Sequence, residues 1–111
     1  YPGLPSHPGY AIARAQQAGS GAMLSFELAG DTEAVRAFVE AIEVFTLAES
    51  LGGVESLIAH PATMTHAKMG VEARRVAGIS DSLLRLSVGL EAESDLLAGL
   101  EAGFTAISNR R

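Results

Sequence analysis

Hydrophobic residues alternate with polar ones in two segments of the chain, 23–28 and 83–88. A period of two is typical of a strand with one covered face. In the second segment, Arg85 falls on the face opposite Leu84 and Leu86. The pattern therefore predicts two strands, the second of which carries a guanidinium on the side away from Leu84 and Leu86.

Other segments have helical character. Residues 10–17 are rich in alanine, and glycines at 19 and 21 end this predicted helix. Asp31 is placed to cap a second helix, whose apolar face comprises Val35, Phe38, Val39 and Ile42. A short helix is predicted to end at Gly78. A closing helix follows from the apolar positions Leu96, Leu97, Leu100, Phe104 and Ile107, with the polar residues 109–111 expected to fray into solvent.

Two short apolar runs, 44–48 and 56–59, are separated by Gly52 and Gly53, which favours two more strands joined by a tight or irregular turn. Strands and helices interleave along a short chain. This order predicts an α/β two-layer sandwich, with a sheet of about four strands and helices on one face.

Composition narrows the class of protein. A chain of 111 residues holds one domain, and 48% hydrophobic with 19% charged residues indicates a globular one. A net charge of -5 and a single lysine argue against a nucleic-acid partner. No apolar run approaches the length of a membrane span. The absence of cysteine excludes disulfides and fits a reducing compartment, so a cytoplasmic location is expected.

Two places could carry binding chemistry. Arg85 needs an anion or water, and its planar fork suits a carboxylate, although spacing alone favours an exposed arginine on an open sheet face. Glu49 and Ser50 follow an apolar strand and precede Leu51 and two glycines, where backbone amides can approach a ligand. The alternative is a glycine turn with two solvated polar residues.

Metal and covalent chemistry have weaker support. The histidines His7, His60 and His66 lack the spacing of a metal site, so no metal is expected. Lys68 has the amine that anchors pyridoxal phosphate, but it lies in a polar segment with nothing to desolvate it. A solvated surface lysine is the simpler interpretation.

Four blocks of sequence are similar to a known family: YPGLPSHPGY, GAMLSFEL, FTLAESLGGVESLIAHPATMTHA and GISDSLLRLSVGLE. In order and spacing they resemble the final third of the Cys/Met-metabolism pyridoxal-phosphate enzymes, most closely the cystathionine γ-synthase type. The resemblance implies the small carboxy-terminal domain of fold-type I pyridoxal-phosphate enzymes. Residues 1–20 would be a connector and the end of an interdomain helix, and residues 21–111 the substrate-side α/β domain. The proline- and glycine-rich start, YPGLPSHPG, also suits a connector after a larger part.

The resemblance also implies roles for individual residues. Arg85 matches the arginine that binds the substrate α-carboxylate, and Ser50 matches a serine that contacts this carboxylate or the cofactor region. Glu49 resembles the residue that recognises the distal amino group of cystathionine. Leu51 and Thr65 match positions lining the same site. No catalytic residue maps onto this chain.

The family's cofactor lysine and phosphate-binding residues match no position here, which implies that pyridoxal phosphate is bound by a preceding amino-terminal domain. The chain alone is then expected to be inactive, and the intact enzyme to be a homotetramer. The implied reaction replaces the γ-substituent of an O-acyl-homoserine by cysteine, giving cystathionine. Alternatives are a cystathionine γ-lyase, an O-acylhomoserine sulfhydrylase, a stand-alone regulatory module that binds a small molecule, and a purely structural fragment.

Overall fold

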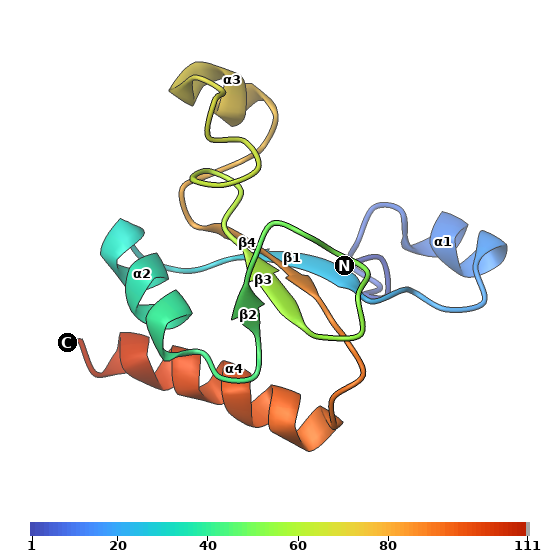
Figure 1. Cartoon of the computed structure of the whole chain (residues 1–111). Coiled ribbons are helices and arrows are strands. Elements are labelled where there is room, and N and C mark those ends of the chain that lie inside the picture. Colours follow the sequence, from blue (N-terminus) through green and yellow to red (C-terminus); the bar gives the residue numbers. More distant parts are fainter. Residues whose placement is uncertain (111) are drawn as a thin grey trace.

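The computed structural model describes residues 1–110, which build one four-stranded sheet with helices against one face and further helices projecting from it (Figure 1). The strands are β1 (Met23–Glu27), β2 (Thr46–Leu47), β3 (Leu57–Ala59) and β4 (Leu83–Ser87), in the sheet order β1-β4-β3-β2. The helices are α1 (Tyr10–Gln16), α2 (Thr32–Ala41), α3 (Val71–Val76) and α4 (Glu93–Ser108). The predicted α/β architecture of about four strands is confirmed.

Helices α2 and α4 pack together and cover one face of the sheet. Asp31 caps α2 as predicted, because its Oδ1 accepts a hydrogen bond of 2.9 Å from the backbone N–H of Ala34. The ring of Phe38 is fully buried and stands edge-on to Phe26 at 6.0 Å and to Phe104 at 5.0 Å between centroids. The buried core is completed by Leu28, Val35, Phe45, Ile58, Leu84, Leu86 and Leu96. This packing fixes β4, whose Leu84 and Leu86 point into the core.

The inner face of α4 differs from the prediction. Leu97, expected to face inward, is 58% exposed, whereas Gly99 and Gly103 are buried. A Cβ on Gly99 would lie 2.0 Å from the carbonyl oxygen of Glu43, and one on Gly103 would lie 2.7 Å from the ring of Phe38. Close approach of the helix backbone, rather than leucine packing alone, therefore joins α4 to its neighbours.

The carboxyl end was predicted to fray, and for Arg110 this is wrong. Its Nη1 lies 3.3 Å from Oδ1 of Asp31, so the end of α4 is tied to the start of α2. The Ala34 N–H, followed by the Arg110 guanidinium, holds the pKa of the Asp31 carboxyl below its ordinary value. Position 111 lies outside the described residues.

The pairing of β2 with β3 also departs from the expected turn. The two strands are parallel, with Thr46 beside Leu57, and both are shorter than the predicted runs 44–48 and 56–59. Parallel neighbours cannot be joined by a hairpin, because the chain must return to the same end of the sheet. Residues 48–56 therefore form a wide, irregular loop, and of the two expected connections only the tight turn is excluded.

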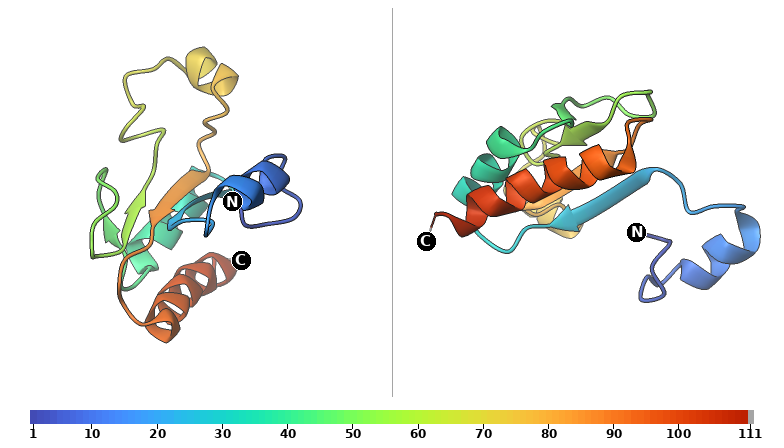
Figure 2. Two further views of the ribbon diagram at one scale, coloured as in Figure 1. Left: turned by 90° about the vertical axis from the view of Figure 1, so that its right-hand side faces the viewer. Right: turned by 90° about the horizontal axis from the view of Figure 1, so that it is seen from below.

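Two segments project from the sheet (Figures 1 and 2). The arm of residues 60–82 connects β3 to β4 and carries α3, and α1 lies off the end of β1. Both helices were predicted and both are present. Helix α3 ends just before Gly78, whose φ of +78° is the left-handed backbone conformation that commonly follows the last turn of an α-helix. Neither helix contains a buried residue. The boundary at residue 20 stays a prediction.

Candidate functional site

The face of the sheet opposite α2 and α4 is covered by the 48–56 loop. Leu84 and Leu86 of β4 point into the core, so Arg85 and Ser87 point to the other side. There the Ser87 Oγ accepts a hydrogen bond of 2.8 Å from the backbone N–H of Gly52, at the centre of the loop. Figure 2, left, shows this green loop and α4 on opposite sides of the strands. The sheet face that carries Arg85 is therefore not open at this residue, contrary to the interpretation that spacing alone favours.

Arg85 lies between this loop and the sheet. Its Nη2 donates hydrogen bonds to the backbone carbonyls of Glu49 at 3.2 Å and Ser50 at 3.3 Å. Its Nε is buried and has no hydrogen-bond partner among residues 1–110. A buried N–H without a partner is costly, and such groups in native structures call for an explanation. A carboxylate that accepts from Nε and a neighbouring guanidinium nitrogen would satisfy it.

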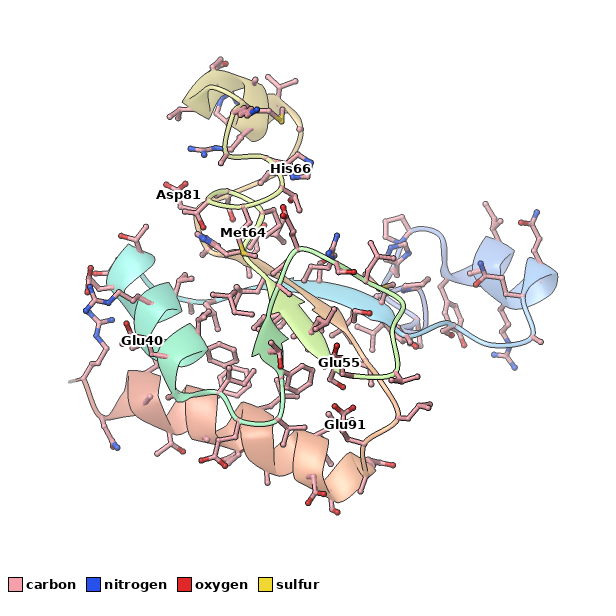
Figure 3. The ribbon with its side chains drawn as sticks, in the orientation of Figure 1. Glu40, Glu55, Met64, His66, Asp81 and Glu91 are labelled. Atoms are coloured by element: carbon pink, nitrogen blue, oxygen red, sulfur yellow. The ribbon has the colours of Figure 1, made fainter. Side chains whose placement is uncertain are left out.

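The end of the loop is held by a second set of hydrogen bonds. Ser56, fully buried, donates from its Oγ to Glu91 Oε1 at 2.7 Å and from its backbone N–H to Oε2 at 2.9 Å. The same Oγ accepts from the Gly89 N–H at 2.8 Å. The hydrogen bonds from Ser56 lower the pKa of the Glu91 carboxyl, the backbone N–H having the larger effect and the hydroxyl the smaller. Glu91 is labelled in Figure 3, beneath the strands.

The predicted site residues are only partly brought together. Glu49 and Ser50 meet Arg85 through their backbone carbonyls, while their side chains and that of Leu51 are exposed. Thr65 lies in the arm, where its Oγ1 is 2.7 Å from Nδ1 of the neighbouring His66. Figure 3 labels His66 in that arm. No hydrogen bond within residues 1–110 joins Thr65 to Arg85.

Sequence reasoning missed the residues that hold the loop, namely Ser56, Ser87 and Glu91. The strand alternation placed Ser87 on the face of Arg85, which was a usable signal. Nothing local connected Glu91 with Ser56, because the two are 35 positions apart. That contact depends on the parallel β2–β3 connection, which the sequence did not reveal.

The described residues fit a carboxylate but do not by themselves fit pyridoxal phosphate. Lys68, the one lysine of the chain, is exposed and makes no hydrogen bond within residues 1–110. Its amine has neither burial nor a charged partner, the features that favour Schiff-base formation between a lysine and the aldehyde of the cofactor. Across residues 1–110, no three His, Cys, Asp or Glu side chains gather to hold a metal, and no helix has the length and apolarity of a membrane span.

The chain matches one protein family over nearly all its length. Residues 1–105 fit the Cys/Met metabolism PLP-dependent enzyme family, and the chain belongs to this family, whose cofactor is pyridoxal phosphate. The resemblance noted in the sequence is confirmed.

Among individual proteins, the chain is 60% identical to cystathionine gamma-synthase of Escherichia coli (strain K12) over 106 residues, covering 96% of this chain and 28% of that protein. A cystathionine beta-lyase of Lactococcus lactis subsp. cremoris (strain MG1363) is 58% identical over 101 residues, 91% of this chain and 26% of that one. The structure of cystathionine gamma synthase from Xanthomonas oryzae pv. oryzae in complex with cystathionine superposes with a TM-score of 0.95 at 62% identity, over 100% of this chain and 29% of that one. The chain thus spans less than a third of these relatives, and both synthases and lyases are similar to it.

Proposed function

We propose that this chain is the substrate-side part of a pyridoxal-phosphate enzyme of the cystathionine γ-synthase type. The reaction would replace the acyloxy group of an O-acyl-homoserine by the thiol of cysteine and give cystathionine. Two relatives named cystathionine gamma-synthase, at 60% and 62% identity, support this choice within the family.

The observation that carries the proposal is the state of Arg85. Its guanidinium is held on one side by the carbonyls of Glu49 and Ser50, and its buried Nε is left free among the described residues. A planar, permanently charged fork held in this way binds a carboxylate in one orientation. Arg85 thus binds the α-carboxylate of the amino-acid substrate and fixes the direction of its Cα.

The other site residues act around this anchor. Ser50 contacts the same carboxylate or the cofactor region, and Leu51 and Thr65 line the site. Glu49 receives the distal ammonium of cystathionine. Its carboxylate is exposed and makes no hydrogen bond to another residue of 1–110, so it is available for such a contact. None of these residues moves a proton in the reaction.

The cofactor would be held by a part of the enzyme outside these residues, in an amino-terminal domain that also supplies the cofactor lysine. When bound, pyridoxal phosphate supplies the electron sink for carbanions of the substrate. This chain's contribution is to bind and orient the substrate by its carboxylate. The intact enzyme would be a cytoplasmic homotetramer, and the isolated chain would be inactive.

The test is a comparison of reactions in the full-length, cofactor-loaded enzyme. Initial rates are measured with O-succinyl- and O-acetyl-homoserine plus cysteine, with the same esters plus sulfide, and with cystathionine alone. We expect kcat/KM for cystathionine synthesis to exceed that of the other reactions by at least about tenfold, a difference of about 1.4 kcal/mol in transition-state binding.

The same assay separates the alternatives within the family. Faster use of sulfide identifies an O-acylhomoserine sulfhydrylase. Faster cleavage of cystathionine identifies a lyase, and the oxo acid released tells a γ-lyase (2-oxobutanoate) from a β-lyase (pyruvate). Either outcome overturns the synthase assignment but leaves the role of Arg85 standing, because all these substrates carry an α-carboxylate.

A further inference from the structure

The 48–56 loop orients Arg85, and β4 itself anchors that loop. Ser87 lies two residues after Arg85 on the same face of β4 and is only 2% exposed. Its Oγ accepts the Gly52 N–H at 2.8 Å, its one hydrogen bond within residues 1–110. The strand that carries the guanidinium thus also fixes the loop whose carbonyls hold that guanidinium.

The contact lies close to the carbonyls that matter. Glu49 and Ser50, whose oxygens accept from Arg85 Nη2, precede Gly52 by three and two residues. Gly52 has φ +75°, a conformation that other residues rarely adopt, so the loop bends sharply where Ser87 holds it. The bonds from Ser56 to Glu91 secure only the far end of the loop.

Small movements of the loop are enough to release Arg85. The two bonds from its Nη2 measure 3.2 Å, at the long end of the usual range for N–H···O bonds, and 3.3 Å, just beyond it. A shift of a few tenths of an ångström would therefore break them. An unrestrained guanidinium must be ordered by the substrate on binding, and that ordering weakens affinity.

We propose that Ser87 is a positioning residue for the substrate carboxylate, acting through the Gly52 N–H and the 48–56 loop on the guanidinium of Arg85. This inference rests on the proposed role of Arg85. Ser87 does not touch the carboxylate. It holds the backbone that keeps Arg85 ready for it.

The experiment is a double-mutant cycle in the full-length, cofactor-loaded enzyme, with Ser87→Ala, Arg85→Ala and the double variant. The probe is L-2-aminobutanoate, an amino acid with an α-carboxylate and no leaving group, and its dissociation constant is measured by calorimetry. We expect Ser87→Ala to weaken binding about 5- to 30-fold when Arg85 is present and less than about twofold when Arg85 is alanine. A melting curve is recorded for each variant.

Matched variants separate positioning from folding. Ser56→Ala removes another buried serine hydroxyl, at the far end of the same loop, and breaks two hydrogen bonds instead of one. It should lower the melting temperature at least as much as Ser87→Ala and still weaken binding less. Ser87→Thr keeps the hydroxyl and should restore binding to within about threefold. Ser87→Cys keeps nearly the same volume with a weak acceptor and repeats the cycle if the alanine variant does not fold.

Each outcome decides between the two assignments. Equal weakening by Ser87→Ala with and without Arg85, or no recovery in a folded Ser87→Thr protein, would show that Ser87 serves folding alone and would overturn the inference. If Arg85→Ala itself leaves the dissociation constant unchanged, the proposed carboxylate site fails instead. A loss with Arg85→Ala but none with Ser87→Ala removes only the role of Ser87.

Discussion

The proposed role of Arg85 depends on the planar shape of its guanidinium as well as on its charge. Replacing it with another cation should therefore not preserve function. Arg85→Lys keeps the positive charge but removes the planar fork, whose fixed donor directions serve the Glu49 and Ser50 carbonyls on one side and a carboxylate on the other. In the full-length enzyme we expect kcat/KM to fall on the order of 10- to 100-fold. Steady-state kinetics beside a melting curve measure this.

The melting curve is the control for this variant. The Arg85 side chain lies on the face of β4 away from the core leucines, so the melting temperature should change little. A nearly normal kcat/KM would sink the carboxylate assignment. A melting temperature that collapses in step with activity would make Arg85 a structural residue.

Glu49 should matter for one class of ligand only. We expect Glu49→Ala in the full-length enzyme to weaken the use or synthesis of cystathionine, whose distal ammonium loses a charge-assisted hydrogen bond of roughly 1.5 to 3 kcal/mol. Binding of L-2-aminobutanoate, which has no distal ammonium, serves as the control and should stay within about twofold. Equal losses for both ligands would point to a general role in the loop, whose backbone at Glu49 holds Arg85.

At this scale the sequence placed Arg85 on the correct face of its strand but could not describe its surroundings. Alternation along 83–88 put Arg85 opposite the core leucines, and this is correct. Whether that face is open depends on the path of a loop 35 positions away, fixed by the Ser87 contact with Gly52. Periodicity reports the face of a strand, not what covers it.

Among the elements, α4 should show that backbone packing can outweigh helix propensity. Gly99→Ala would gain up to about 1 kcal/mol of propensity. The added Cβ, however, would lie 2.0 Å from the Glu43 carbonyl oxygen, and overpacking of this kind costs about 1–3 kcal/mol. We expect a net loss in the free energy of unfolding, measured by urea denaturation of the 111-residue chain.

A glycine with free space around it provides the comparison. Gly19→Ala places its Cβ where no atom lies within 4 Å, so its effect should stay within about 0.5 kcal/mol. If Gly99→Ala proves as stable as the parent chain, the close approach of α4 to Glu43 is not a constraint on this fold.

The contact between Asp31 at the start of α2 and Arg110 after the end of α4 should make the free energy of unfolding depend on pH in the acidic range. The pKa of Asp31 is lowered from its ordinary 3.8 by the Ala34 N–H and then by Arg110. A carboxyl with a lowered folded pKa contributes stability that is present above 3.8 and is lost as pH falls through the folded pKa. Asp31→Asn keeps a capping oxygen but cannot ionise, so stability should fall less steeply on acidification below about pH 4.

Urea denaturation of the two chains at several acidic pH values measures this slope. Glu101→Gln, which removes an exposed carboxylate without a hydrogen-bond partner among residues 1–110, is the control for the loss of one negative charge. The lowered pKa values of Glu72 and Glu91 leave a residual slope in every variant. An unchanged slope in Asp31→Asn would contradict the role given to this pair.

Elements with local signals were predictable, and the one that depends on distant pairing was not. The α2 helix had a capping residue and a regular apolar face, and both are found. The β2–β3 pair reads as strands joined by a turn, yet the two strands are parallel neighbours, and β4 pairs antiparallel with the other edge of β3. Strand direction is set by neighbours far along the chain.

The molecule as a whole is less compact than its core. Its radius of gyration is 14.7 Å, against roughly 13 Å for a compact domain of this length. The excess comes from α1 and the arm with α3, which stand away from the sheet (Figure 2). Both carry large apolar side chains in solvent, with Ile12 63%, Val71 76% and Val76 75% exposed. The compact part of the molecule therefore consists of the sheet, helices α2 and α4, and the 48–56 loop that contacts Arg85.

The same distribution predicts that the 111-residue chain does not retain pyridoxal phosphate. Lys68 lies exposed in the arm, and without burial or a charged neighbour its amine has no advantage over any surface lysine. Mixing the chain with the cofactor and removing the excess by gel filtration should leave no aldimine absorbance, and Lys68→Ala should give the same spectrum. The full-length enzyme, treated identically, should keep its cofactor band. A band that survives filtration in the 111-residue chain and disappears in Lys68→Ala would show that this chain holds the cofactor itself, contrary to its assignment to the substrate side.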